Sequence, residues 1–202
     1  MKKPTFEPVL PAGYVPVFTV DAKAKKTVIL LNVVGTLIAL ALIAGFWAVL
    51  RPDLAGLFRS GALLAANAAL LCGMLAYIPL HELVHGAAYK ILTKQKLTFG
   101  ISLGAAFCGV PSIYSYRRTA LITLLAPFTV FGVLFGAGIV FFRNEVPRLV
   151  FTLLFSVHVG SCVGDLYDTF LLLTRFRSPD LLMNDTGPKQ TFYLPAEKNG
   201  EK

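Results

Sequence analysis

The chain has 202 residues, of which 55% are hydrophobic and 15% charged, and its mean hydropathy is +0.67. This composition is far from that of an ordinary water-soluble domain, and it predicts an integral membrane protein. The net charge of +8 does not require a nucleic acid as partner, because basic residues beside anionic lipid headgroups account for it. The three cysteines have no CxxC spacing, which favours a packing role over a zinc site or a disulfide framework.

Residues 1–26 are polar and rich in Pro and Lys, and they lack an apolar segment followed by a small-residue cleavage site. We interpret them as a cytoplasmic N-terminal segment and not as a signal peptide. Four apolar runs follow, each long enough to cross about 30 Å of hydrocarbon. They are Thr27 to Leu50, Gly61 to Leu92, Thr119 to Phe142 and Leu149 to Thr174. The expected fold class is an all-α membrane protein, a bundle of four transmembrane helices within residues 27–177.

The positions of the basic residues predict the orientation of this bundle. Of the 19 Lys and Arg residues, only four lie in or beside the first and third connections: Arg51, Arg59, Arg143 and Arg148. The others precede the first run, lie around the connection between the second and third runs, or follow the fourth run. By the positive-inside rule, we expect a multi-pass protein of the inner membrane with both termini in the cytoplasm.

The connection between the second and third runs has a period of two. Leu97, Phe99, Ile101 and Leu103 alternate with small or polar residues, which predicts a short strand or a re-entrant hairpin at the inner membrane face. A substrate peptide that leaves a transmembrane helix has unpaired N–H and C=O groups, and a strand edge can pair them. These four residues are therefore candidate substrate-binding positions. The alternative is an amphipathic cover that lies on the membrane.

Residues 178–202 contain three prolines and show neither helical nor strand periodicity, so we expect a cytoplasmic tail. Within it, Asp185-Thr186-Gly187 matches the DTG sequence of aspartic proteases. Those enzymes need two such aspartates, each after buried apolar strand residues, whereas this DTG is single. The turn preference of Asp and Gly makes a turn the better interpretation.

The chemistry is expected in the second run, which contains His81-Glu82-Leu83-Val84-His85, an HExxH sequence. Residues four apart share one face of a helix, so His81 and His85 can bind one zinc ion while Glu82 acts as general base toward a water. Ionisable groups at membrane depth are costly and usually mark a functional site. The alternative is a solvated histidine pair at a helix end.

A catalytic zinc needs a third protein ligand. At about 1.5 Å per residue, Asp165 and Asp168 in the fourth run lie at nearly the depth of the two HExxH histidines. Asp165 is the preferred ligand, and Asp168 is an alternative ligand or a residue that orients a ligand or a water. His158, one heptad before Asp165, is a rival ligand nearer the outer side. Gly160 and Gly164 form a GxxxG step just before Asp165, which favours close helix packing there.

These motifs resemble those of a known family. HELVHG, Ala126-Pro127-Phe128 and Gly164-Asp165-Leu166-Tyr167-Asp168 are similar to the motifs of small bacterial membrane proteins classed as putative zincin peptidases, which are distantly similar to site-2 intramembrane proteases. The resemblance covers roughly Leu63 to Arg175. It implies that the third zinc ligand is Asp165. The Asn and Pro usual before that aspartate, and the Gly usual after it, are missing.

The sequence therefore predicts a Zn²⁺-dependent membrane peptidase, with a membrane protein or peptide as substrate and the lipid bilayer as its surroundings. Its principal competitor is a non-catalytic membrane protein in which a His and Asp metal site cross-links two spans. A metal or proton carrier is a third class, but the first and third runs offer no polar path to the outer face.

Overall fold

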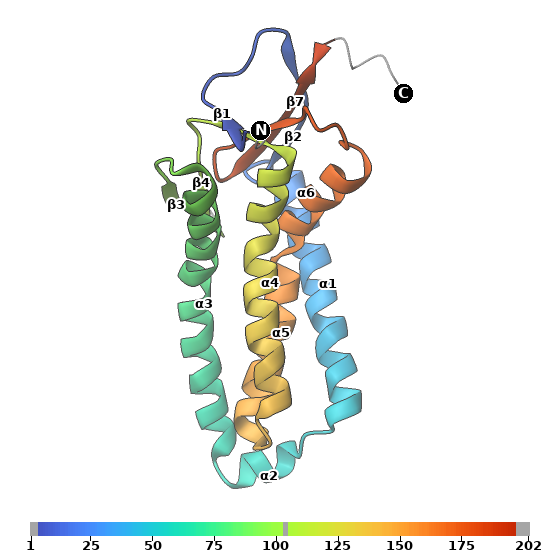
Figure 1. Ribbon diagram of the computed structural model, residues 1–202. Coiled ribbons are helices and arrows are strands. Elements are labelled where there is room, and N and C mark those ends of the chain that lie inside the picture. The colour runs from blue at the N-terminus through green and yellow to red at the C-terminus, as the bar shows by residue number, and fades with distance from the viewer. Residues whose placement is uncertain (1–3, 103–104, 197–202) are drawn as a thin grey trace. The chain divides into compact units, whose positions relative to one another are not determined.

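The computed structural model describes residues 4–102 and 105–196 (Figure 1). The chain forms two compact units, each built from separate stretches of sequence. Unit 1 comprises Met1–Ile29, Glu82–Ala126 and Asp165–Lys202, and unit 2 comprises Leu30–His81 and Pro127–Gly164. Three helices contribute residues to both units: α1 (Lys25–Leu50), α3 (Ala62–Thr93) and α4 (Arg117–Phe141). The fold is mostly helical, as expected.

Unit 2 is helical, and α5 (Glu145–Ser161) is the helix against which its neighbours pack. Asn144 begins α5 by accepting a hydrogen bond from the Val146 amide, as an N-cap does, and Asp53 caps the short helix α2 (Leu54–Arg59) in the same way. Small residues allow close contact: Gly73 of α3 lies against Leu154, and a side chain at Gly35 of α1 would collide with the carbonyl oxygen of Gly160. The buried residues of α5 are Val150, Thr152, Leu154, Ser156, His158 and Gly160.

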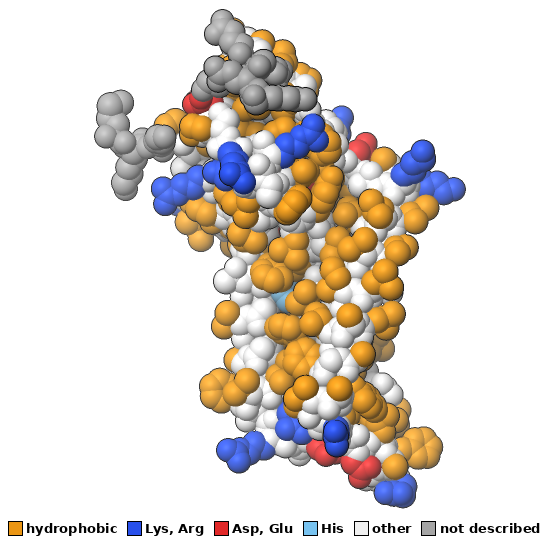
Figure 2. Space-filling model, turned by 90° about the vertical axis from the view of Figure 1, so that its right-hand side faces the viewer, with side chains coloured by type: hydrophobic (Ala, Val, Ile, Leu, Met, Phe, Trp, Pro, Cys, Tyr) orange, Lys and Arg blue, Asp and Glu red, His pale blue; other side chains and the backbone are white. Residues whose placement is uncertain are grey.

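Three helices are long and apolar enough to cross a membrane: α1, α3 and α4. α5 and α6 (Val163–Thr174) form a fourth candidate if this pair, broken at Cys162, is counted as one span. The first three runs expected from the sequence are therefore helices, whereas the fourth is two helices and not one. Hydrophobic side chains cover much of the helical surface (Figure 2), and α1 buries only Gly35. This exposure is expected of helices that have hydrocarbon as their solvent.

The expectation of an all-α fold is incomplete, because unit 1 contains a five-stranded antiparallel sheet in the order β1-β5-β6-β7-β2. Its strands are β1 (Phe6–Glu7), β2 (Tyr14–Asp21), β5 (Tyr114–Tyr116), β6 (Leu182–Asp185) and β7 (Lys189–Pro195). The expected tail thus supplies two strands, and the N-terminal segment supplies two more. β6 gives no alternating pattern because Leu181, Leu182 and Met183 are all fully buried, as in a strand covered on both faces.

The core of unit 1 fixes the elements that carry the candidate site. It joins the sheet to α6 and to the first turns of α4, and it includes Val20, Ala120, Leu124, Leu171, Leu172, Phe176, Leu181, Met183 and Phe192. Each fully buried Leu or Phe side chain contributes about 1.5–3 kcal/mol. The packing therefore holds the first turn of α6, which contains Asp165, and the part of α4 that contains Thr123.

The connection after α3 forms a two-stranded antiparallel sheet of β3 (Thr98–Ser102) and β4 (Ala105–Gly109). Its register runs from Thr98 opposite Gly109 to Ser102 opposite Ala105. The strand expected at this place is confirmed. Leu103, one of the candidate substrate-binding residues, lies outside the described residues.

Candidate metal centre

Helix α3 carries the HExxH residues. It is one helix from Ala62 to Thr93, although Pro79 lies inside it. The four-residue spacing therefore places the imidazoles of His81 and His85 one turn apart on the same side of the helix. Both side chains are buried, at 8% exposure each, and Glu82 is half-buried.

In unit 1, His85 lies between a carbonyl group and a carboxylate. Its Nδ1 is 2.8 Å from the carbonyl oxygen of Thr123, which can only accept a hydrogen bond, so Nδ1 carries the proton. In the neutral ring the lone pair is then on Nε2, which is 3.5 Å from Oδ2 of Asp165. This is the tautomer that binds a metal through Nε2, with the other nitrogen oriented by a backbone carbonyl. Asp165 is the acidic residue of the first turn of α6.

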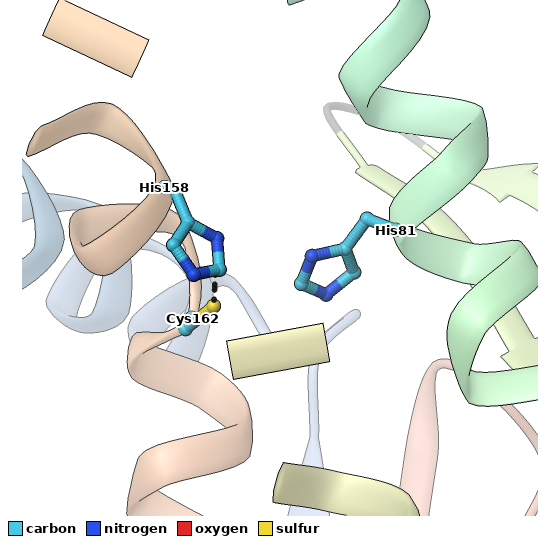
Figure 3. Close-up of side chains that lie close together, drawn as sticks. All are labelled: His81, His158 and Cys162. Carbon is cyan, nitrogen blue, oxygen red and sulfur yellow. Dashed lines mark hydrogen bonds between the residues drawn. The ribbon is translucent and has the colours of Figure 1, made fainter. Parts of the chain in front are cut away.

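In unit 2, His81 belongs to a second group of polar side chains (Figure 3). Ligand atoms of His81, His158 and Cys162 lie within 4.8 Å of one another. His158, expected from the sequence as a rival ligand, is fully buried, and its Nδ1 is 3.5 Å from the Cys162 sulfur. The hydroxyl of Tyr77 is 2.9 Å from His81 Nδ1 and 2.8 Å from His158 Nδ1. His158 therefore contacts a tyrosine that also contacts His81.

Asp168 has a different setting from that of Asp165. It is 3% exposed, and its Oδ1 has no hydrogen-bond partner among the described residues. It is Asp165, and not Asp168, whose carboxylate is 3.5 Å from His85. A buried polar atom without a hydrogen bond is costly, and Asp168 Oδ1 shares this condition with Thr169 Oγ1 in the part of the chain that the structure describes.

Asp185 is a buried residue whose contacts the sequence does not predict. The Asp-Thr-Gly segment is a turn, as expected: Gly187 has a φ of +94°, and its amide donates to Asp185 Oδ1 at 2.8 Å. The other carboxylate oxygen accepts a 2.7 Å hydrogen bond from the hydroxyl of Tyr89, which lies one turn after His85. Burial raises the pKa of the Asp185 carboxyl above its ordinary value. The positions 81, 85 and 89 share a helical spacing, which is the signal that could have drawn attention to Tyr89.

The β3–β4 hairpin lies against the helix turn that follows the motif. A Cβ atom at Gly86, the residue after His85, would be 2.8 Å from Phe99 Cζ and 3.1 Å from Leu97 Cδ1. Glycine thus allows the two side chains to contact α3 directly. Ile101 is 89% exposed and Phe99 is half exposed, and β4 is the only described strand that pairs with β3. Within the described residues, the other edge of β3 carries no strand.

Burial raises the pKa of the Cys108 thiol on β4 to about 12, so this thiol stays protonated at neutral pH.

Comparison with protein families gives one match. The model of a family described as putative zincin peptidase matches residues 74–178, which is more than half of the chain. The matched region includes the HExxH segment, the β3–β4 hairpin and the two aspartates of α6. No curated protein and no solved structure matches the chain. The chain therefore belongs to the putative zincin peptidase family.

Proposed function

We propose that this protein is a zinc-dependent peptidase of the membrane, which hydrolyses peptide bonds near the cytoplasmic face. The observation that carries the proposal is the pairing of His85 Nε2 with Asp165 in unit 1, beside the glutamate of an HExxH sequence. Membership of a zincin peptidase family supports the same reaction class.

The donor set fits zinc. His85 presents an Nε2 lone pair, His81 lies one turn earlier on the same helix, and Asp165 supplies a carboxylate oxygen. Two imidazoles and one carboxylate are a frequent ligand set of catalytic zinc, which keeps its fourth position for water or substrate. Zinc, when bound in such a site, polarises a carbonyl group and makes a water molecule more acidic. The proposed ligands are His81, His85 and Asp165.

Glu82 is the proposed general base and then general acid. Its carboxylate takes a proton from the water as the water oxygen attacks the carbonyl carbon of the peptide. It then gives this proton to the amide nitrogen as the C–N bond breaks, so that the carboxylate is regenerated. Because Glu82 precedes His85 by three residues on one helix, it is placed on the same side of α3.

The substrate is proposed to add as a strand to the open edge of β3, with Leu97, Phe99 and Ile101 beside it. The contact of the hairpin with Gly86 supports this position, because it keeps β3 next to the turn that holds His85. An extended backbone also exposes the scissile carbonyl better than a helix does. Replacing Ile101 by Pro removes one backbone donor and distorts the edge, so cleavage should fall while zinc content stays constant. Ile101→Ala is the matched control, and equal cleavage by both variants would reject strand addition.

The orientation of the helices in the membrane is proposed from the distribution of Lys and Arg alone. The bias of Lys and Arg toward the termini and the second connection supports a cytoplasmic location for both ends and for the β3–β4 hairpin. Reporter fusions at Asp53 and Glu145 should therefore read external, and one at Gln95 internal. The opposite pattern would overturn this orientation.

The experiment that tests the reaction compares the wild type with Glu82→Gln. The amide cannot take a proton, so cleavage should fall by about 10²-fold or more while zinc stays bound. Mass spectrometry of membrane peptides that accumulate in cells with Glu82→Gln identifies substrates, and purified protein then cleaves them in detergent. Glu145→Gln, at the start of α5, is the control. Unchanged cleavage by Glu82→Gln would remove Glu82 from its proposed role as general base.

A further inference from the structure

Unit 2 holds a hydrogen-bonded group of which the proposed reaction uses only His81. Tyr77 lies one turn before His81 on α3, and its hydroxyl is within 2.9 Å of polar atoms of His81, His158 and Ser161. In Figure 3 the side chains of His81 on α3 and His158 on α5 point toward each other. The hydrogen positions in this group can be assigned, because one end of it is a backbone carbonyl.

His158 accepts a hydrogen bond from Tyr77. Its Nε2 is 3.2 Å from the carbonyl oxygen of Phe128, which can only accept, so Nε2 carries the proton and Nδ1 has the lone pair in the neutral ring. Two groups can donate to this lone pair: the Tyr77 hydroxyl at 2.8 Å and the Cys162 thiol at 3.5 Å. The hydroxyl is closer and is the stronger donor. Tyr77 therefore donates to His158.

His81 is the second histidine in contact with the Tyr77 hydroxyl. A tyrosine hydroxyl has one proton, and the imidazole nitrogen of His158 is a stronger acceptor for it than the Ser161 hydroxyl, which is also 2.8 Å from Tyr77. With that proton directed to His158, Tyr77 accepts in its 2.9 Å contact with His81 Nδ1. His81 consequently carries its proton on Nδ1, and the lone pair of its neutral ring is on Nε2. We infer that Tyr77 and His158 are positioning residues, which fix the tautomer and the ring orientation of His81 so that Nε2 is the metal-binding nitrogen. This inference rests on the proposed function for the identity of the ligand.

The hydrogen-bonded chain His158–Tyr77–His81, called the relay below, lies in surroundings that strengthen its hydrogen bonds. Tyr77 is 5% exposed and His158 is fully buried. The rings of Phe131 and Phe135 lie 5.1 Å and 5.9 Å from the Tyr77 ring, which excludes water from the hydrogen bonds. Hydrogen bonds are stronger in such an environment, and a broken one leaves a buried donor or acceptor unsatisfied. Loss of the tyrosine hydroxyl would therefore leave the Nδ1–H of His81 without this acceptor.

The relay predicts the zinc affinities of a set of variants. Tyr77→Phe and His158→Leu should each weaken zinc binding by about tenfold or more, measured by competition with a chelator. Because both act through one hydrogen-bonded chain, the double variant should be no weaker than the weaker single variant. His158→Asn places an oxygen near the position of Nδ1 and should bind zinc nearly as well as the wild type. Unchanged affinity in Tyr77→Phe, or losses that multiply in the double variant, would overturn the relay.

Cys162→Ala separates positioning from direct metal binding. The thiol is a weak donor at 3.5 Å, so this variant should keep wild-type zinc affinity. Cobalt in place of zinc should give no thiolate-to-metal charge-transfer band. Loss of zinc in Cys162→Ala, or such a band in the wild type, would make His158 and Cys162 metal ligands and would overturn the relay.

One measurement is independent of peptidase activity and of metal. Nitrogen NMR of the His81 ring in metal-free protein should place the proton on Nδ1, and Tyr77→Phe should shift it toward Nε2. A proton on Nε2 in the wild type would overturn the relay even if Glu82 proves catalytic. Conversely, the expected NMR result together with activity that does not depend on Glu82 would reject the proposed function alone.

Discussion

Asp185 links the C-terminal hairpin to the helix that carries the candidate ligands. Its carboxylate accepts hydrogen bonds from Tyr89, from the Gly187 amide and from the Gln190 side chain. The turn at this place could be predicted from Asp, Thr and Gly, because these residues favour turns locally. The contact with Tyr89 could not, since the two residues are 96 positions apart and are brought together only by the sheet.

The titration of Asp185 should be visible in the stability of the protein. Burial raises its folded-state pKa above the ordinary value of 3.8, so the folded chain binds this proton more tightly than the unfolded chain does. The resulting contribution to folding is complete below 3.8 and is lost as the pH rises through the folded-state pKa. Asp185→Asn is neutral at every pH, so its thermal unfolding in detergent should lack this fall in stability as the pH rises above about 4. The control is Asp53→Asn, at an exposed helix cap. If stability fell equally with rising pH in Asp185→Asn and in the wild type, the raised pKa of Asp185 would be contradicted.

At the scale of elements, the close approach of helices could be predicted only in part. The GxxxG step marks Gly160 correctly, but its partner is Gly35 of α1, whereas a Cβ at Gly164 would have no neighbour within 4 Å. A glycine pattern shows that a helix can approach another closely but does not say which one. The strands of the five-stranded sheet were not predicted, for a similar reason. β2 and β7 pair Tyr14 with Pro195, and such long-range pairing leaves no local period in the sequence.

The contact between α1 and α5 gives a matched pair of variants on one helix. Gly35→Ala places a methyl group against the backbone of Gly160 and should lower the free energy of unfolding by about 1–3 kcal/mol. Gly45→Ala, where a Cβ would meet nothing within 4 Å, should leave stability unchanged or raise it by up to about 1 kcal/mol. Thermal unfolding of both variants in the same detergent makes the comparison. Equal loss in both would show that the packing of α1 on α5 is looser than described.

At the scale of the whole molecule, residues 6–21 and 182–195 take part in one fold. β1 and β7, the first and last strands in the sequence, lie in the same sheet. The core beside that sheet holds α6 and the start of α4. The helix that carries the HExxH sequence and the approach of Asp165 to His85 were predictable, because helix spacing and depth are local properties of the sequence. Tyr77 also has a local position, one turn before His81 on α3. The contacts of His158 with Tyr77 and of Thr123 with His85 were not predictable, because only tertiary packing brings these residues together.

Metal content, measured by elemental analysis of purified protein, tests the proposed zinc site most directly. The wild type and Glu82→Gln should each contain about one zinc per chain, because the glutamate is not a ligand. Asp165→Ala should lose most of this zinc, and the double variant with His81→Ala and His85→Ala should lose all of it, since two of at most four ligands are gone. Zinc at the wild-type level in that double variant would contradict the proposed site.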